Sequence, residues 1–264
     1  GDDGITLTDE KDLTLTANAA DITVTSVVGV AGNTGEDLTI TITQNAATGG
    51  TVTVGAISTD INDVNITAPT IKLGGNITTE EDPNGGSADA ASIDLNGDVV
   101  VNASTVTLTT GNGTIDFSDN VNSAASAGNS LTIVSGTGTA VFNDAIGTGT
   151  NGALGTLTVN SAGTGNITFN SDADVGTTSV AGASRILIGN AATGTLALDG
   201  SFYTSSGGDS TNAAQIYTAD AFTMSGTDPD FHSAATAAAI KFVDGAASDI
   251  VLSNSADLTI QTNN

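Results

Sequence analysis

A short pattern of apolar residues that recurs between residues 71 and 121 constrains the fold more than any other feature. Two apolar residues in alternation are followed by three small or polar residues and then by a third apolar residue. The copies begin at Ile71, Ile93 and Ile115, which are equally spaced in the sequence. Alternation predicts a short half-buried strand. Self-similarity at a fixed period of roughly 20 to 50 residues is typical of solenoids, propellers and repeat arrays.

The same pattern continues with drift through the rest of the chain. The later copies are Ala140–Phe142 with Ile146, Ile167–Phe169 with Val175, Leu196–Leu198 with Phe202, and Ile240–Phe242. A second series of strands begins at Val106, Leu131, Leu157 and Ile186, in steps that lengthen along the chain. Coils of variable length around a constant strand kernel indicate a parallel β-helix, because insertions fall in the turns while the inward positions stay stacked.

Residues 1–66 contain a dense series of alternating strands rich in Thr. They are expected at Ile5–Leu7, Leu13–Leu15, Ile22–Val24, Leu38–Ile42, Val52–Val54 and Val64–Ile66. Three such strands would make one coil. The sequence therefore predicts an all-β, right-handed parallel β-helix (a β-solenoid) over residues 1–264, with roughly ten or eleven coils of about 22 to 29 residues. Residues 1–66 form its Thr-rich coils and residues 67–264 carry the apolar pattern described above.

Composition agrees with this architecture and excludes others. Gly makes up 33 of 264 residues and charged residues only 12%, against a usual charged share of roughly 25%. A propeller would show a stricter period of about 40 residues or more with aromatic signatures, and the chain has no Trp. Residues 78–92 and 205–214 are expected to be loops that leave the coil, and residues 232–239 a helical turn or a loop.

The charge balance restricts the partners. Four basic and 29 acidic residues give a formal net charge of −25, so nucleic acid and anionic lipid, which bind clustered Lys and Arg, are excluded as partners. No run of about 18 apolar residues is present, which argues against membrane insertion. The chain has no Cys, so no disulfide framework is expected.

Three segments resemble a known group of proteins. They are Phe142–Gly147, Leu154–Val159 and Gln215–Met224, which run from Phe through an Ile-Gly corner to a Leu-Thr-Val strand and, further on, to a Gln-x-Tyr strand. This sequence pattern resembles that of the filamentous haemagglutinin-type exoproteins and related β-strand-repeat adhesins, which are secreted by two-partner or autotransporter routes. The likeness covers roughly residues 90 to 230. It implies a right-handed parallel β-helix on a bacterial cell surface, and the family's secretion-signal domain is not visible.

One stretch has the residue types of a calcium loop. Asp94, Asn96 and Asp98 supply oxygen ligands, and alternation places Asp94 and Asn96 on the outward face while Leu95 points inward. Calcium takes six to eight oxygens, of which these side chains supply only a part. The alternative is a solvated Asp/Asn turn. No cofactor is required by the sequence, and Ca²⁺ is the one candidate.

Catalysis is not expected. Pairs of acidic residues (Asp60/Asp63, Asp172/Asp174, Asp228/Asp230 and Glu80–Asp82) raise the alternative of a glycan-binding or glycan-cleaving β-helix of the tailspike or lyase type. Such enzymes set several carboxylates on one face beside basic residues, whereas Lys11, Lys72, Arg185 and Lys241 are far apart in sequence. The one histidine, His232, is interpreted as a loop residue.

Thr-x-Thr pairs near the N-terminus also raise the alternative of an ice-binding solenoid. Neighbouring pairs lie closer together in the sequence than one coil, so they are expected to fall on different sides of the coil. A flat ice-binding face would need them stacked at one register.

The two ends of the sequence suggest how the rod is extended. The strand pattern begins at Ile5 and Leu7 and is still present at Leu258 and Ile260, with no amphipathic capping helix. The chain is therefore expected to be a segment of a longer rod, or to stack head to tail through these four residues. The predicted function is an extracellular structural or adhesive rod, with self-association or a glycan or cell-surface partner.

Overall fold

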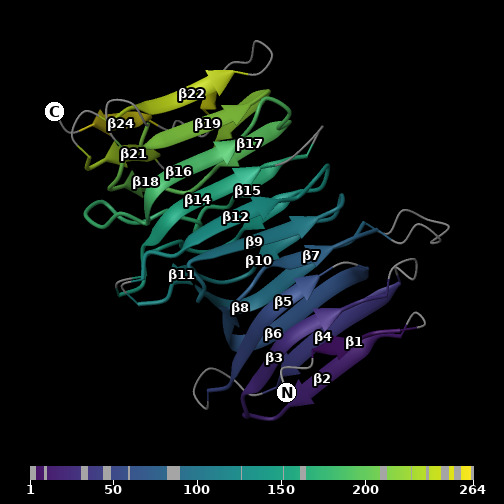
Figure 1. Cartoon of the computed structure of the whole chain (residues 1–264). Helices are drawn as coiled ribbons and strands as arrows, with labels where there is room; N and C mark the ends of the chain where they lie inside the picture. The colour runs from purple at the N-terminus through teal and green to yellow at the C-terminus, as the bar shows by residue number, and fades with distance from the viewer. Residues whose placement is uncertain are drawn as a thin grey trace.

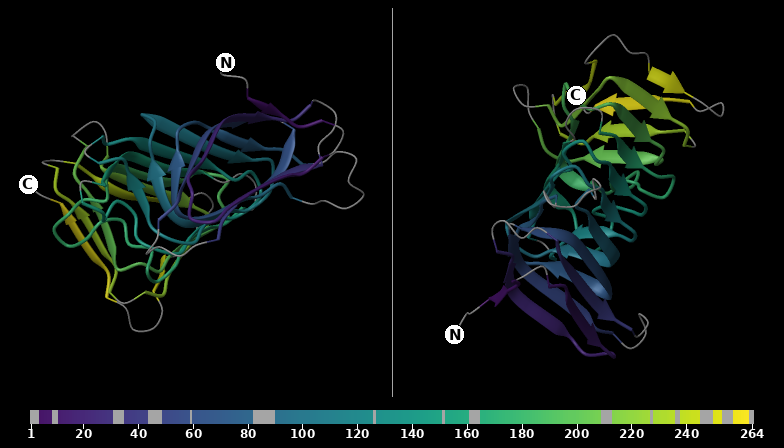
Figure 2. Two further views of the ribbon diagram at one scale, coloured as in Figure 1. Left: turned by 90° about the horizontal axis from the view of Figure 1, so that it is seen from below. Right: turned by 90° about the vertical axis from the view of Figure 1, so that its right-hand side faces the viewer.

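The computed structural model describes fourteen stretches of the chain, and within them every regular element is a β-strand. The stretches are residues 4–8, 11–30, 35–43, 49–58, 60–81, 90–125, 127–150, 152–160, 165–208, 213–226, 228–235, 238–244, 250–252 and 257–262. The strands stack as parallel coils along one axis, and the N-terminal and C-terminal coils lie at opposite ends of the stack (Figures 1 and 2). The predicted all-β solenoid is confirmed.

Each coil has three faces, and the first face is the most regular. Its strands are β2 (Leu13–Ala17), β4 (Glu36–Ile42), the first part of β6 (Ile61–Leu73) and of β8 (Ile93–Val101), β10 (Ile115–Phe117), β13 (Ala140–Phe142), β15 (Ile167–Phe169), β17 (Thr195–Leu198), β20 (Ala221–Met224) and β23 (Ile250–Leu252). Parallel pairing stacks one residue of each strand in a ladder, here Leu13, Leu38, Val64, Ile93, Ile115, Ala140, Ile167, Leu196, Phe222 and Ile250.

The second face turns away from the first and continues the coil. It holds the first part of β3 (Ile22–Val28) and of β5 (Thr51–Ser58), the second part of β6 and of β8, then β11 (Val121–Ser123), two isolated bridges, β18 (Phe202–Ser205), β21 (Asp230–Ser233) and β24 (Thr259–Thr262). Its ladder is Ile22, Val52, Ile71, Val99, Val121, Ile146, Val175, Tyr203, Phe231 and Ile260.

The third face closes the coil. It holds β1 (Ile5–Thr6), the second part of β3 and of β5, β7 (Ile77–Thr79), β9 (Thr105–Thr110), β12 (Ser130–Val134), β14 (Leu154–Asn160), β16 (Ala183–Gly189), β19 (Gln215–Ala219) and β22 (Ile240–Asp244). Its ladder is Ile5, Val27, Ile57, Ile77, Leu108, Ile133, Val159, Ile188, Tyr217 and Phe242.

The ladders give the true repeat of the chain. Along the first face the steps between paired residues, from the short step of Ile93 to Ile115 to the long step of Ile167 to Leu196, agree with the predicted coil length. Along the other two faces the steps vary more, and some are shorter or longer than predicted. Ten levels joined by nine turns place the described residues at the lower edge of the predicted coil number. The six strands predicted in residues 1–66 and the second series at Val106, Leu131, Leu157 and Ile186 are all present.

The repeat that begins at Ile71 is placed wrongly by the sequence pattern. Ile93 and Ile115 do pair, but Ile71 pairs with Val99 on the second face, and the residue below Ile93 is Val64. All three faces use the same alternating kernel, so the pattern alone does not say which face a strand occupies. Later, Phe202 was expected at the inward corner position. Instead Tyr203 pairs with Val175 and is fully buried, since the corner before it is one residue longer.

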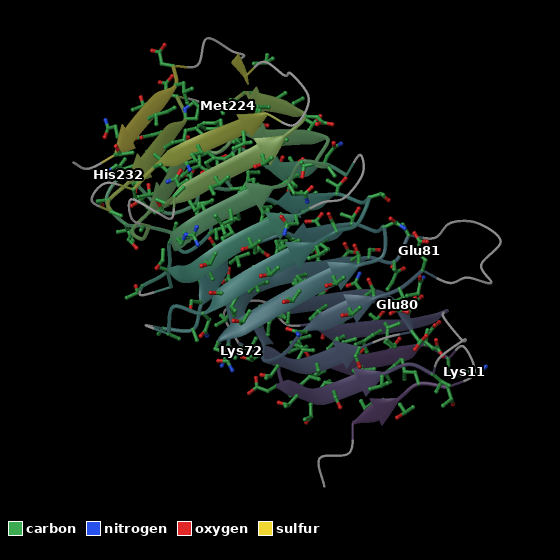
Figure 3. The ribbon with its side chains drawn as sticks, turned by 45° about the horizontal axis from the view of Figure 1, so that its top comes forward. Lys11, Lys72, Glu80, Glu81, Met224 and His232 are labelled. Atoms are coloured by element: carbon green, nitrogen blue, oxygen red, sulfur yellow. The ribbon has the colours of Figure 1, made fainter. Side chains whose placement is uncertain are left out.

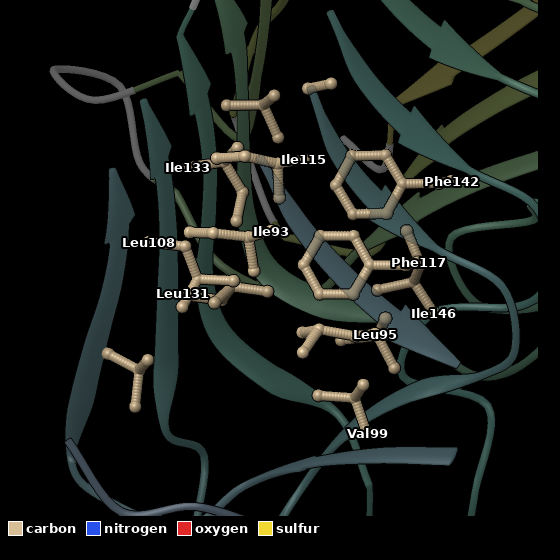
Figure 4. Close-up of a cluster of buried hydrophobic side chains, with 14 of the residues drawn as sticks. Ile93, Leu95, Val99, Leu108, Ile115, Phe117, Leu131, Ile133, Phe142 and Ile146 are labelled. Atoms are coloured by element: carbon tan, nitrogen blue, oxygen red, sulfur yellow. The ribbon is translucent and has the colours of Figure 1, made fainter. Parts of the chain in front are cut away.

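The interior changes character along the axis. In the lower coils the ladders consist of Ile, Val and Leu. From Phe117 upward, rings join them: Phe117, Phe142 and Phe169 stack in parallel with centroids 4.9 and 4.7 Å apart. Figure 4 shows the first two of these rings, Phe117 and Phe142. Above them Tyr203 stacks on Phe231 at 4.8 Å. Such contacts add to the free energy gained from burial.

Candidate functional site

The residues of the predicted calcium loop lie on β8, and two of the three already have partners in the next coil. Asn96 Oδ1 accepts a hydrogen bond from Ser118 Oγ at 2.8 Å, and Asp98 Oδ1 accepts one from Asn120 Nδ2 at 3.0 Å. Asp94 is half-buried and alternates with the buried Leu95, as predicted. In the part of the chain that the structure describes, no group of three His, Cys, Asp or Glu side chains lies close enough to hold a metal ion.

Asp94 lies near carboxylates of the two adjacent coils. It pairs with Asp116 in the coil above and with Asn65 in the coil below, where Asp63 lies two residues before Asn65. Burial raises the pKa of Asp94, and the negative charges of Asp116 and Asp63 raise it further. Burial also raises the pKa of Asp116, although the hydrogen bond that Asn143 Nδ2 donates to its Oδ1 at 2.7 Å opposes the shift. Proximity of like charges without a cation disfavours ionisation.

Below Asp94, carboxylates cap the start of each strand on the first face. Asp12 Oδ1 accepts the backbone N–H of Asp37, and Asp37 Oδ1 accepts that of Asp63, both at 3.2 Å. Asp63 Oδ1 accepts both the backbone N–H and the hydroxyl of Ser92, each at 2.7 Å. Each carboxylate thus satisfies a donor of the coil above it, as an N-cap side chain does at the start of a helix.

The same arrangement recurs at other corners, always with a donor roughly one coil later in the chain. The further acceptor and donor pairs are Asp21 with Thr51, Asn76 with Thr107, Asn112 with Thr137, Asn122 with Gly149, Asn166 with Thr195, Asp174 with Ser201 and Phe202, Asp199 with Ser225, and Asp228 with Asp257. Backbone N–H groups that leave the strand ladder at a corner need an acceptor. Seven of the 29 acidic residues, all of them Asp, therefore stabilise coil corners in this way.

A second polar column follows the strands of the first face. In six successive coils, a buried Leu, Phe or Met on the first face is followed directly by a polar residue; in chain order these polar residues are Asn96, Ser118, Asn143, Asn170, Asp199 and Ser225. Asn170 Nδ2 donates to Asn143 Oδ1 at 2.5 Å, and Ser225 Oγ donates to Asp199 Oδ1 at 2.6 Å. Sequence analysis missed this column. Its signal is a polar residue directly after each apolar kernel.

The upper coils hold a polar network inside the core. The fully buried Gln215 donates from Nε2 to the backbone oxygens of Tyr203 (2.7 Å) and His232 (2.8 Å), and accepts from Tyr217 OH at 2.9 Å. The Tyr203 hydroxyl in turn accepts the backbone N–H of Gly200 at 3.1 Å. Burial raises the pKa of both tyrosines. The network links β18, β19 and β21 across the interior and satisfies all its members, which is the condition for a stable buried polar cluster.

The residues of the enzyme alternative are spread over the molecule. His232 lies in β21 and not in a loop, and its imidazole is on the outward side of that strand. Arg185 donates from Nε to the backbone oxygen of Ala213 at 3.1 Å. Lys11 and Lys72 lie in the lower coils and His232 near the upper end (Figure 3). Of the weaker acidic pairs, Glu81 accepts from Asn112 Nδ2 at 2.7 Å, while Asp82 lies outside the described residues, as does most of the loop expected at 78–92.

Neighbouring Thr-x-Thr pairs lie on different faces, as expected: Thr14 and Thr16 are on the first face and Thr23 and Thr25 on the second. Pairs one coil apart do stack, because Thr14 and Thr16 pair with Thr39 and Thr41. These two pairs are separated by one full turn of the coil. The stack ends at the next level, where Asn65 lies above Thr39. The array is two levels deep.

The four residues expected at an assembly interface lie in the end coils. Ile5 pairs with Val27 and packs against the core, and Leu7 is buried. Leu258 also packs against the core, whereas Ile260, which stacks on the fully buried Phe231, is 49% exposed. The inward ladder therefore ends in an open apolar position.

The comparisons with known proteins add no relative. Neither a scan against protein-family models nor searches of curated proteins and of solved structures found a match for this chain. Among the described residues, no helix is long and apolar enough to cross a membrane.

Proposed function

We propose that this chain is a stacking module of an extracellular rod with a structural or adhesive role at a bacterial cell surface. The observation that carries the proposal is the open state of both end coils. In the described residues, β22, β23 and β24 pair only with the coil below them, and β1 and β2 only with the coil above. An unpaired strand edge is a template for another strand.

The two open ends are compatible with one another. Every coil presents the same three parallel strands, so the upper edge of β22, β23 and β24 matches the lower edge of β1, β2 and β3 in direction. Head-to-tail contact of this kind does not close on itself and produces a filament. Continuation of the same chain into further coils would satisfy the edges equally well. Ten levels at about 4.8 Å give roughly 48 Å for each module.

The role of the carboxylates supports a structural function over a catalytic one. Members of three acidic pairs that raised the enzyme alternative lie at separate corners, where Asp63, Asp174 and Asp228 accept backbone N–H groups. A catalytic pair needs two carboxylates facing one substrate position. The resemblance to adhesin exoproteins adds the cell-surface location to the proposal.

Glycan binding remains the second candidate, because the third face carries a flat column of hydroxyls. Thr107, Thr132 and Thr158 pair in register over three coils. Their side chains face outward from the buried ladder beside them. A binding assay with neutral polysaccharides, comparing the parent with a Thr132→Val variant, tests this role.

The filament proposal is tested by sedimentation and electron microscopy over a range of concentrations. Ile260→Asp places a charge at the open end and is expected to abolish end-to-end association. Val180→Asp is the matched control, because Val180 is 48% exposed and lies in a turn on the side of the rod. Fibres with an axial repeat of roughly 48 Å that survive Val180→Asp support the proposal. A parent protein that stays monomeric at high concentration contradicts the proposal, and so does an equal loss of end-to-end association in both variants.

A further inference from the structure

Buried oxygen atoms without a hydrogen-bond partner gather at one corner of the lower coils. Among the described residues, five buried side-chain atoms lack a partner: Glu36 Oε1, Glu36 Oε2, Asn62 Oδ1, Thr79 Oγ1 and Asp230 Oδ1. The first four come from β4, β6 and β7. Buried polar groups are otherwise paired in folded proteins, so four unpaired oxygens in one place indicate a missing partner.

Strand pairing sets these residues one above another. Glu36 pairs with Ile61, the neighbour of Asn62. Directly after this pair the register shifts, so that Asn62 and Asp63 both lie opposite Asp37 in a β-bulge. In the next coil, Glu80 donates its backbone N–H to the oxygen of Ile61 at 2.8 Å, which puts Thr79 at the level above Ile61. The corner therefore spans three successive coils. Bulges of this kind are enriched beside functional sites.

Glu36 and Thr79 are directed into the interior, whereas Asn62 lies in the bulge, where its amide group hydrogen-bonds the Asp37 carboxylate while its Oδ1 is buried without a partner. Glu36 and Thr79 are 0% and 1% exposed and Asn62 is 9% exposed, and Glu36 shares the inward row of β4 with Leu38. In the coil above Thr79, the corresponding polar side chain has a hydrogen-bond partner nearby in its own coil. Thr110, which pairs with Thr79, donates to the backbone oxygen of Gly113 at 2.9 Å. The unpaired oxygens of this corner thus lie below Thr110.

The chemistry of the unpaired atoms identifies the partner. A carboxylate and an amide oxygen are both acceptors, so Glu36 and Asn62 Oδ1 do not satisfy one another. An isolated carboxylate in an apolar interior is strongly unfavourable. The neighbouring Asp37 and Asp63 lie in the outward row and accept backbone N–H groups. Lys11, in the coil below, is exposed.

We infer that this corner binds one hard divalent cation, Ca²⁺, with the Glu36 carboxylate as a bidentate ligand, Asn62 Oδ1 and Thr79 Oγ1 as further ligands, and backbone oxygens or water completing the shell. Ca²⁺ takes six to eight oxygen ligands in flexible geometry. Bound inside the coil, the ion ties β4, β6 and β7 together and neutralises Glu36, the one fully buried carboxylate among the described residues. The site lies apart from the outward residues Asp94, Asn96 and Asp98 of the sequence prediction.

The test compares the parent with Glu36→Gln, which keeps the shape of the side chain and removes its charge. Metal-stripped protein is titrated with Ca²⁺ by calorimetry in physiological salt with excess Mg²⁺, and thermal unfolding is followed with and without Ca²⁺. The parent is expected to bind one more Ca²⁺ than the variant and to gain in melting temperature with Ca²⁺. Without metal the order reverses, and Glu36→Gln melts at the higher temperature.

Two control variants keep the result decisive. The double variant Asp94→Asn with Asp98→Asn is expected to retain the extra Ca²⁺, because both residues face outward. Lys11→Met is expected to leave binding and stability unchanged. Equal Ca²⁺ stoichiometry in parent and Glu36→Gln, or loss of the extra ion in the outward double variant, overturns the proposal. Destabilisation by Lys11→Met also overturns the proposal, because Lys11 would then be the partner of Glu36. A parent protein whose stability does not respond to Ca²⁺ and rises only on acidification overturns it as well, because a proton would then be the partner of Glu36.

Discussion

The lower and upper coils of this solenoid share one backbone plan and fill it differently. Up to residue 101 the ladders contain only Ile, Val and Leu, whereas all seven Phe and both Tyr residues of the chain lie at or after Phe117. Strand pairing continues through the change without a break, since Ile93 pairs with Ile115 and Leu95 with Phe117. Main-chain pairing therefore sets the coil, and the three ladders accept different apolar and aromatic side chains at their stacked positions.

The corners differ in the same way. In the lower coils β6 and β8, with 13 and 9 residues, each run across two faces. In the upper coils the first-face strands β10, β13 and β15 have only 3 residues, and polar columns and the Gln215 network occupy the space between faces. The lower region relies on β-branched residues that suit long strands, and the upper one on ring stacking and internal hydrogen bonds.

The largest expected effect on stability comes from truncating a stacked ring of the upper coils. Phe142 lies between Phe117 and Phe169 in the parallel stack, so Phe142→Ala should lower the free energy of unfolding by about 3 to 5 kcal/mol. Because both tyrosines are in the upper coils and the chain has no Trp, tyrosine fluorescence in urea follows the upper coils and circular dichroism follows both. The matched truncation Ile66→Ala in the lower coils should cost less than Phe142→Ala, within about 2 to 5 kcal/mol, because no ring stacking is lost. Equal losses would contradict the special role of the stack.

The next effect concerns the buried network of the upper coils. Gln215→Leu leaves the backbone oxygens of Tyr203 and His232 without their donor and the Tyr217 hydroxyl without its acceptor. We expect a loss of about 3 kcal/mol, at about 1 to 3 kcal/mol for an unsatisfied buried group. Tyr217→Phe removes a single hydrogen bond and should cost about 1 kcal/mol. Denaturant unfolding measures both, and a Gln215→Leu variant as stable as the parent would show that the network does not stabilise the fold.

A smaller effect tests the corner carboxylates of the lower coils. Asp63→Ala removes the acceptor of two hydrogen bonds from Ser92 and should cost about 1 to 2 kcal/mol, by analogy with the loss of a helix cap. Asp63→Asn keeps an acceptor oxygen and should retain most of that stability. Urea unfolding of the two variants separates the hydrogen bond from the charge. An equal loss in Asp63→Asn and Asp63→Ala would mean that the charge, and not the acceptor oxygen alone, is stabilising.

The smallest expected effect is a pH dependence at Asp94. Its pKa is raised in the folded state above the ordinary value of 3.8, so the folded protein binds more protons than the unfolded chain and stability falls as the pH rises through the raised pKa. Asp94→Asn should therefore raise the melting temperature slightly at pH 7. The gain should shrink as the pH falls towards about 4. A gain that is independent of pH would attribute the effect to packing.

The architecture was predictable because one apolar alternation repeats throughout. Thr-flanked kernels such as Leu131–Ile133 gave both the strand and the partner one coil away. The face that each strand occupies was harder to predict. Ile71 and Ile93 begin similar sequence patterns but belong to different faces, because the strands of all three faces carry the same apolar alternation. Tyr203 was missed for a related reason, as one extra corner residue reverses which of two adjacent aromatic side chains points inward.

The polar residues were harder to interpret than the apolar ones. Asp94 and Asp98 drew attention as an acidic cluster, yet the same residue types act at Asp12, Asp37 and Asp63 as acceptors for the coil above. Which role a carboxylate has depends on a donor one whole coil away in the sequence, and no local motif records it. Glu36 shows the opposite case: it is an acidic residue two places before Leu38, and the alternation of β4 directs it inward.

The pairing of each coil with its two neighbours alone also bears on how such a chain changes length during evolution. Removing residues 140–166, one complete turn from Ala140 to the residue before Ile167, would bring Ile167 onto Ile115, Val175 onto Val121 and Phe169 onto Phe117. Every new neighbour is of the same type as the one it replaces. Genes of this kind can therefore gain or lose whole turns by unequal recombination, and the length of the rod is free to vary while its cross-section is conserved.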